Sequence, residues 1–231
     1  MLQHPAWFPA GDRLLYATGG VESAARIFEQ RVDVPGAPRQ LVEGIWGSIS
    51  RDGRTLFVIN DVRAMGRLSR RAIGADGSIG TAEALAPDLD VDDVEQSPNG
   101  GAAAIVFHGE RGPEIALIGL DNALRQRVTT DGGTQPHFSA DGRILYYLAS
   151  EAAANGRRVQ RLMRVPITTT KPFQIGKPAA AFGGSSGADR VDVSHYALAQ
   201  DDRLLVAVEE PASRRSRTVL VQNWPALISG R

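Results

Sequence analysis

The chain contains no cysteine, which excludes disulfide bonds and thiolate-bound metals but does not place the protein in any compartment. Lysine is almost as scarce: Lys171 and Lys177 are the two occurrences, so arginine carries nearly all of the positive charge. The formal net charge is zero, and no segment shows the concentrated positive charge that is typical of a nucleic-acid surface. We therefore expect no nucleic-acid partner.

Long apolar runs are also missing. No stretch approaches the roughly 20 consecutive apolar residues of a membrane span, and the N-terminus lacks the charged region and apolar run of a secretory signal. The sequence thus predicts no direct membrane insertion, and a periplasmic or other extracytoplasmic location would need a segment from a larger protein. Turn-forming residues are plentiful, with 25 glycines and 13 prolines beside 42% hydrophobic residues. This composition is typical of a single β-rich domain.

One short phrase recurs five times along the chain, and its clearest copies are residues 49–57 and 138–146. Each copy has an apolar or aromatic residue before the turn, with Gln96 there in the third copy, then a turn of the type Ser-x-Asp-Gly and a run of apolar residues. The turn position falls 42, 47, 42 and 60 residues apart, at Gly11, Gly53, Gly100, Gly142 and Asp202. A period of roughly 40 to 50 residues with strand-like signals indicates propeller blades.

The turn itself explains why these residue types recur. Ser and Asp side chains can bond the nearby backbone, and Gly takes the left-handed conformation that closes a short hairpin. Each copy therefore predicts a β-hairpin. Because Asp202 replaces glycine in the last copy, we expect the fifth turn to be the least stable.

Two further strands follow each hairpin, so the predicted fold is all-β: a β-propeller of about five four-stranded blades in one domain. The predicted repeats are approximately 4–45, 46–91, 92–134, 135–193 and 194–231, and the fourth is lengthened by the irregular segments 168–177 and 183–190. An outer strand is missing from the last repeat. The sequence leaves open a closed ring, an open arc and part of a six-bladed ring. We favour a fragment of a larger propeller, because an open ring would leave an unpaired edge, which is an aggregation hazard.

Residues 7–11, 96–100 and 138–146 resemble the W-S-P-D-G repeat of TolB-like, WD-repeat-like β-propellers, and the five copies cover most of the chain. Residues 171–178 and 218–224 are similar to the closing segment of TolB-like propellers that form the C-terminal sensor half of bacterial serine/threonine kinases. The resemblance implies a non-catalytic binding, sensor or scaffold module with a protein or peptide partner at the propeller face. It implies no catalytic residue, cofactor or metal, and a repeat match predicts fold better than ligand.

Two enzymatic alternatives remain open. The chain could be the propeller portion of a larger enzyme, a protein kinase or a prolyl-oligopeptidase-type hydrolase, whose catalytic domain lies elsewhere. It could also be a lyase that uses His137 and His195 with a cation bridged by Asp92 and Asp93. Residues 183–187 match the G-x-S-x-G nucleophile elbow, but the following sequence is strand-like, so we expect a Gly/Ser loop.

Loops that lead into the inner strands of a propeller crowd around one mouth of its channel. Six residues at such places form a hypothetical ring of ligand contacts: His4, Trp46, Asp92, Asp93, Gln135 and His195. The alternative is that these side chains are simply solvated loop ends. His108 ends a second strand, so we expect it at the periphery.

Three other features have competing interpretations. The acidic run 88–95 could bind calcium, but Asp93 and Asn99 stand where an EF-type loop needs Gly and Glu, so a mobile solvated loop is favoured. Two groups of arginines could form a rim for an acidic partner or merely exposed strand positions: Arg63, Arg67, Arg70 and Arg71, and Arg157, Arg158, Arg161 and Arg164. Trp7 and Trp224 are assigned to packing, and Trp7→Ala should cost about 3 to 5 kcal/mol.

Overall fold

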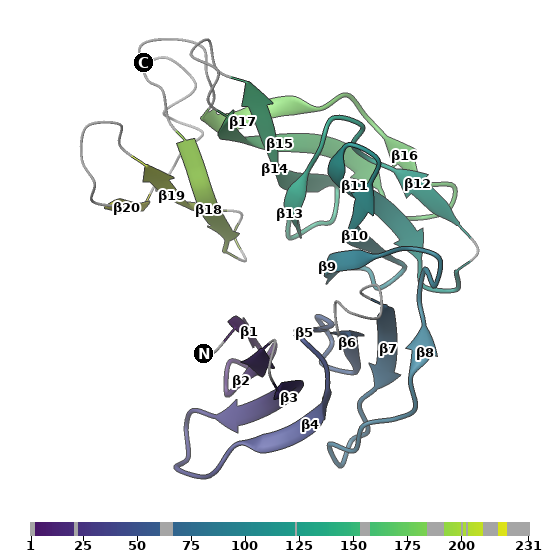
Figure 1. Cartoon of the computed structure of the whole chain (residues 1–231), viewed down its shortest axis with the longest axis vertical. Helices are drawn as coiled ribbons and strands as arrows, with labels where there is room; N and C mark the ends of the chain where they lie inside the picture. The colour runs from purple at the N-terminus through teal and green to yellow at the C-terminus, as the bar shows by residue number, and fades with distance from the viewer. Residues whose placement is uncertain are drawn as a thin grey trace.

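A computed structural model describes residues 3–20, 23–60, 67–122, 124–152, 158–183, 192–199, 201, 203–209 and 217–220. These residues form the strands β1 to β20 and contain no helix that could cross a membrane. Every strand pair is antiparallel, and the strands form five sheets in chain order, called blades 1 to 5 (Figure 1). The all-β prediction is therefore confirmed.

The first three blades have four strands each, and each runs in sequence order from the inside outward. Blade 1 contains β1 (Gln3–Trp7), β2 (Arg13–Gly20), β3 (Ser23–Arg31) and β4 (Arg39–Glu43). Blade 2 contains β5 (Trp46–Ile49), β6 (Thr55–Ile59), β7 (Leu68–Ala72) and β8 (Glu83–Ala84). Blade 3 contains β9 (Val91–Gln96), β10 (Ala102–Gly109), β11 (Gly112–Gly119) and β12 (Arg125–Arg127).

The last two blades depart from this pattern. Blade 4 contains β13 (Thr134–Phe138), β14 (Ile144–Ala152), β15 (Arg158–Thr168), β16 (Gln174–Ile175) and β17 (Ala179–Gly183), and both β16 and β17 pair with the long β15. Two residues of the segment expected to be irregular thus form a strand. In blade 5 the described strands are β18 (Asp192–Leu198), β19 (Leu204–Glu209) and β20 (Arg217–Leu220).

The predicted turn chemistry is present in the hairpins. Gly11, Gly53, Gly100 and Gly142 have φ values of 71°, 71°, 73° and 71°. In blade 4 the Ser139 hydroxyl donates to Asp141 Oδ1 at 2.7 Å and accepts from the Ile144 N–H at 3.0 Å. The same Ser pattern closes the hairpins of blades 2 and 3.

The fifth hairpin differs from the other four in length. Its closing bond runs from the Ala199 N–H to the Arg203 carbonyl, a separation of four residues, whereas Ser139 bonds Ile144 five residues on. The turn is therefore one residue shorter than the repeat pattern predicts. Asp202, on which we expected a strained conformation, lies outside the described residues.

The core consists of layers between neighbouring blades, since each blade is apolar on both faces. Along β10, Ala103 and Ile105 pack toward blade 2, while Ala104 and Val106 pack toward blade 4. Equivalent layers join blades 1 and 2, and blades 4 and 5. The period-2 alternation of a strand thus serves two interfaces at once. Figure 1 shows that the five blades curve into an arc, with an opening between blade 5 and blade 1.

Our placement of Trp7 in the core is wrong. Trp7 is 59% exposed, whereas its neighbour Phe8 is 2% exposed and packs between blades 1 and 2. Consecutive strand residues point to opposite faces, and Trp7 points toward the face of blade 1 that no described residue covers. The predicted cost of 3 to 5 kcal/mol for Trp7→Ala therefore does not apply to this arrangement.

Candidate functional site

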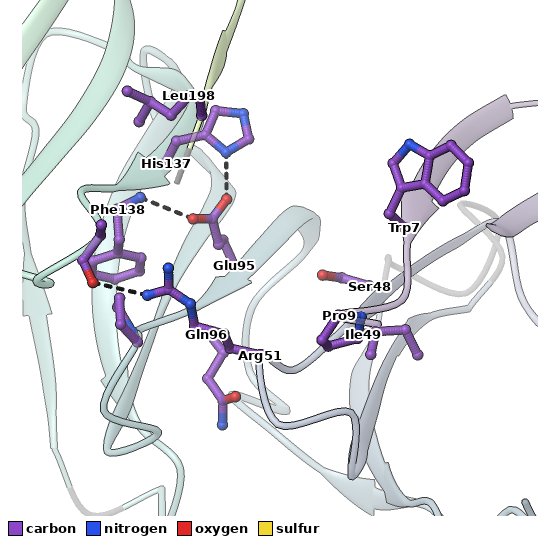
Figure 2. Close-up of a pocket in the computed structure, with 13 residues that line it drawn as sticks. Trp7, Pro9, Ser48, Ile49, Arg51, Glu95, Gln96, His137, Phe138 and Leu198 are labelled. Atoms are coloured by element: carbon purple, nitrogen blue, oxygen red, sulfur yellow. Dashed lines mark hydrogen bonds and ion pairs between the residues drawn. The ribbon is translucent and has the colours of Figure 1, made fainter. Parts of the chain in front are cut away.

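The inner strands β1, β5, β9, β13 and β18 surround a central channel, and a cavity of about 530 Å³ opens at one end of it. All five blades contribute to its wall. Residues able to hydrogen bond stand beside apolar ones (Figure 2): Arg51, Glu95, Gln96 and His137 among the former, and Trp7, Ile49, Phe138 and Leu198 among the latter. Such a mixed, concave wall is typical of a ligand site.

Glu95 is the centre of the polar part of the wall. One carboxylate oxygen, Oε2, bonds His137 Nδ1, and the other, Oε1, accepts the Phe138 N–H at 2.9 Å. Since Glu95 belongs to β9 and both partners belong to β13, the carboxylate joins the inner strands of blades 3 and 4. It also fixes the orientation of the imidazole ring, as a carboxylate partner commonly does for histidine.

A second set of contacts joins blade 4 to blade 5. The Tyr196 hydroxyl donates to the Gln135 carbonyl oxygen at 2.5 Å, and the ring of His137 meets Tyr196 edge-on at 5.1 Å between centroids. Gln135 Nε2 lies 3.3 Å from His195 Nδ1. The polar cluster of Asp93, Glu95, Gln135, His137, His195 and Tyr196 therefore spans three consecutive inner strands.

A β-bulge sets the direction of these side chains. The register between β13 and β14 shifts by one residue between Thr134 and His137, and Gln135 there has a φ of 52°. Similar shifts occur at corresponding places in blades 1, 3 and 5. A bulge re-aims the residues that follow it, and here it leaves His137 beside Glu95.

The electrostatics of the cluster favour retained protons. Burial raises the pKa of Asp93 to about 7; the charge of His137 lowers it and the charge of Glu95 raises it further. Burial by itself lowers the pKa of His137, but the charge of Glu95 and its hydrogen bond, together with Asp93, leave that pKa above its usual value. Burial, then Glu95 and Asp93, raise the pKa of the Tyr196 hydroxyl well above its usual range. Asp93 therefore changes its protonation state near neutral pH.

Three of the six residues proposed from the sequence come together in this cluster: Asp93, Gln135 and His195. Two others do not. Trp46 packs half-buried against the core between blades 2 and 3, because β5 pairs with β6 without a bulge. Asp92 lies within 2.9 Å of His108 Nε2, on the opposite side of the strand from Asp93. His4 belongs to β1, but its side chain lies outside the described part.

The acidic run is not the mobile loop that we favoured, since residues 91–96 form the inner strand β9. Its carboxylates diverge: Asp88 bonds Arg125 at 2.8 Å, Asp92 meets His108, and Glu95 meets His137. Among the residues the structure describes, no three His, Asp or Glu side chains lie together as metal ligands would.

None of the described arginines of the two groups lines the channel cavity, and Arg63 and Arg157 lie outside the described residues. Arg70 pairs with Glu83 on the neighbouring strand at 2.7 Å, and Arg161 pairs with Glu151 at 2.9 Å. Each of these pairs joins neighbouring strands within a single blade. Of the segment 183–187, the described residue is Gly183 at the end of β17, and the rest lies outside the described residues, as does Trp224.

Sequence reasoning missed Glu95 and Tyr196 as members of the cluster. A signal was available, because Pro5 and Pro136 both stand six residues before the turn glycine of their repeat. Proline cannot donate to a ladder and in strands is found at edges and bulges. A bulge at this position changes which residues face the channel. In β9 it places Glu95 there instead of Asp92, and in β13 it places His137 there.

Radially stacked antiparallel blades around a channel define a β-propeller. Solved structures with the same fold include a protein assigned as TolB from Agrobacterium tumefaciens, which is 16% identical, has a TM-score of 0.65, and matches 93% of this chain and 72% of its own. TolB from Acinetobacter baumannii is 14% identical with a TM-score of 0.59, over 94% of this chain and 56% of its own. The chain therefore has a TolB-like propeller fold.

Propellers with other names share this fold. The periplasmic gluconolactonase PpgL of Pseudomonas aeruginosa is 20% identical with a TM-score of 0.58, over 94% of this chain and 70% of its own. No family model matches the sequence, and no curated protein matches it. At these identities the likeness is one of fold.

Proposed function

We propose that the chain is a non-catalytic binding module that takes a peptide or an extended segment of a partner protein into the channel cavity, and so acts as a sensor or scaffold. The observation that carries the proposal is the cavity wall, which five blades build from apolar and hydrogen-bonding side chains. A peptide offers both kinds of group along its length, so a mixed wall suits it better than a uniformly charged or apolar one.

The hydrogen bonds within the wall support a binding role. Both oxygens of Glu95 form hydrogen bonds within the protein, so this carboxylate holds blades 3 and 4 together. The other ring nitrogen of His137, Nε2, has no hydrogen-bond partner among the described residues and points away from Glu95 (Figure 2). Together with the amide of Gln96 on the same wall, it is placed to bond a peptide backbone.

A selection of displayed random peptides on the full chain tests this proposal. We expect the selected peptides to bind Gln96→Lys at least about tenfold more weakly, since the change puts a charged, longer side chain into the cavity. Gln126→Lys, on the outer strand β12 of the same blade, is the matched control and should bind as the wild type does. Equal binding to both variants would show that the cavity is not the site.

A second function is favoured by one specific observation, the carboxylate-oriented imidazole of His137, which has the geometry of a general base. Two of the solved propellers are named gluconolactonase or 6-phosphogluconolactonase. If this chain acted likewise, it would hydrolyse a sugar lactone and His137→Gln would abolish turnover. The binding proposal predicts no lactone or ester hydrolysis above that of a heat-denatured sample.

The parent architecture belongs to the same proposal. The similarity of residues 218–224 to kinase-linked propellers supports a module within a signalling protein, although residues 221–224 lie outside the described part. A coding region for a kinase domain and a membrane span upstream of residue 1 would bear this out, and a hydrolase domain in frame would favour the enzyme alternative.

A further inference from the structure

One face of blade 1 is aromatic and largely uncovered. Trp7 pairs with Leu14, and Tyr16 pairs with Phe28, so the four side chains share the face that points away from blade 2. Trp7 is 59% exposed and the other three are half-buried. The rings of Tyr16 and Phe28 stack at 5.9 Å. This set, here the blade 1 face, extends across β1, β2 and β3.

Blade 4 carries almost the same set at the same register. Phe138 pairs with Leu145, and Tyr147 pairs with Met163, which matches the blade 1 face position by position. In blade 4, however, the set is covered: Phe138, Leu145 and Tyr147 are 7%, 0% and 4% exposed. They pack against blade 3 in one core cluster.

The part of blade 3 that covers them has small side chains on its second strand, β10, and larger ones, Ile115 and Leu117, on β11. Ala102, Ala104 and Val106 alternate along β10 and are 0%, 0% and 2% exposed in that cluster. Small residues opposite large aromatic ones allow the two sheets to approach and fill the space between them. A sheet that covers the blade 1 face should therefore carry small residues at the matching positions.

The other side of the opening is also an uncovered blade face. Leu205 of β19 is 37% exposed and shares its face with Ala207, whereas Leu204 and Val206 on the other face are buried against blade 4. Figure 1 shows an opening between the described strands β18 and β1. Both uncovered faces border it.

We propose that the blade 1 face is a docking surface for one further antiparallel blade, supplied by a polypeptide outside residues 1–231, with small residues on its second strand. The inference continues the interfaces of the arc, since the same register positions are covered by a sheet in blades 2 to 5. A single peptide strand is too narrow, because the face spans three strands at about 4.8 Å each. Trp7 also lines the channel cavity, but the channel proposal is tested at Gln96 and this one at the face that Trp7 forms with Leu14, Tyr16 and Phe28.

A defined probe follows from the match between blades 1 and 4. A copy of residues 90–133 is fused so that its last residue, Gly133, directly precedes Gln3, as it precedes Thr134 in the chain. We expect the fused copy to cover Trp7: acrylamide quenching of the Trp7 fluorescence, taken as the difference from a Trp7→Phe partner, should fall at least about threefold, because a buried indole is shielded from solvent. The melting temperature should rise.

The matched control carries Ala102→Glu and Ala104→Glu within the fused copy alone, which places two charges against the aromatic face. It should show the quenching of the unfused chain. Equal quenching in the fusion and its control would overturn the proposal. So would concentration-dependent shielding of Trp7 in the unfused chain by sedimentation and quenching, which would make a second copy the occupant.

Discussion

At the scale of single residues, the Glu95 side chain joins the inner strands of blades 3 and 4. Its two oxygens bond the His137 ring and the Phe138 backbone N–H on the next blade. Asp93 lies two residues earlier on the same face, so a charged Asp93 would be repelled by the Glu95 carboxylate. A wholly apolar contact would stabilise this junction without responding to pH. The polar one couples blade packing to protonation.

We expect Glu95→Gln to lower the free energy of unfolding by about 1 to 3 kcal/mol, because it removes a charged acceptor from two hydrogen bonds. It should also lower the pKa of His137, which Glu95 now holds up. Denaturant unfolding and an NMR titration of the His137 ring check the two effects. Glu110→Gln, in an exposed turn, is the control and should change neither.

The raised pKa of Asp93 predicts how the free energy of unfolding depends on pH. Its pKa is raised in the folded state to about 7, so the folded protein holds a proton that the unfolded chain has lost above about pH 4. Stability from this group therefore falls as pH rises from about 4 to about 7 and then levels off. The raised pKa of His137 acts in the same direction, since its contribution is complete below the unfolded value near 6.5 and is lost as pH rises through the folded pKa.

The stability of Asp93→Asn relative to that of the wild type should therefore increase as pH rises. Melting temperatures of both proteins at pH 5 and pH 8 measure this: the wild type should lose more between the two values than the variant. Parallel changes would mean that Asp93 is not a buried acid in the folded protein.

At the scale of elements, the hairpins were predictable because each turn contains the residue types that form it. The Ser-x-Asp-Gly turns specify strand ends within a few residues, and the glycine φ values confirm the reason. The inner-strand bulges were not predicted, since a bulge changes register without changing composition. A shift of one residue moves a side chain to the other face. The bulges in β9 and β18 therefore place Glu95 and Tyr196 in the site and Asp92 outside it, whereas Trp46 lies outside it because β5 has no bulge.

The turn glycines allow a matched comparison. Gly11 and Gly142 both have a φ of 71°, but a Cβ on Gly11 meets nothing within 4 Å, whereas one on Gly142 lies 3.2 Å from Pro98 of blade 3. Gly11→Ala should cost about 1 to 2 kcal/mol for the left-handed backbone, and Gly142→Ala should cost more. Urea unfolding of the two variants measures the difference, and equal costs would mean that the turns of blades 3 and 4 do not pack together.

At the scale of the whole molecule, the sequence could predict that blades recur but not how they close. The period of the repeats reports each blade separately, whereas the arc depends on contacts between residues far apart in the chain. Trp7 illustrates the limit: its local pattern matches the buried Phe138, and only the absence of a described neighbour on its face makes it exposed. One long-range contact crosses the channel: the bond of 2.8 Å from Arg51 Nη1 to the Ala140 carbonyl oxygen, which joins the turn of blade 2 to that of blade 4.

Because the chain has no cysteine, this contact can be tested by cross-linking introduced thiols alone. Arg51→Cys with Ala140→Cys should react with a short bismaleimide to give an intrachain link between peptides 89 residues apart, detected by mass spectrometry. Arg51→Cys with Glu110→Cys, whose second site lies in a turn between β10 and β11, should give none. Efficient linking of the first pair alone supports blades curled around one channel, and failure of that pair, or equal linking of both, would contradict it.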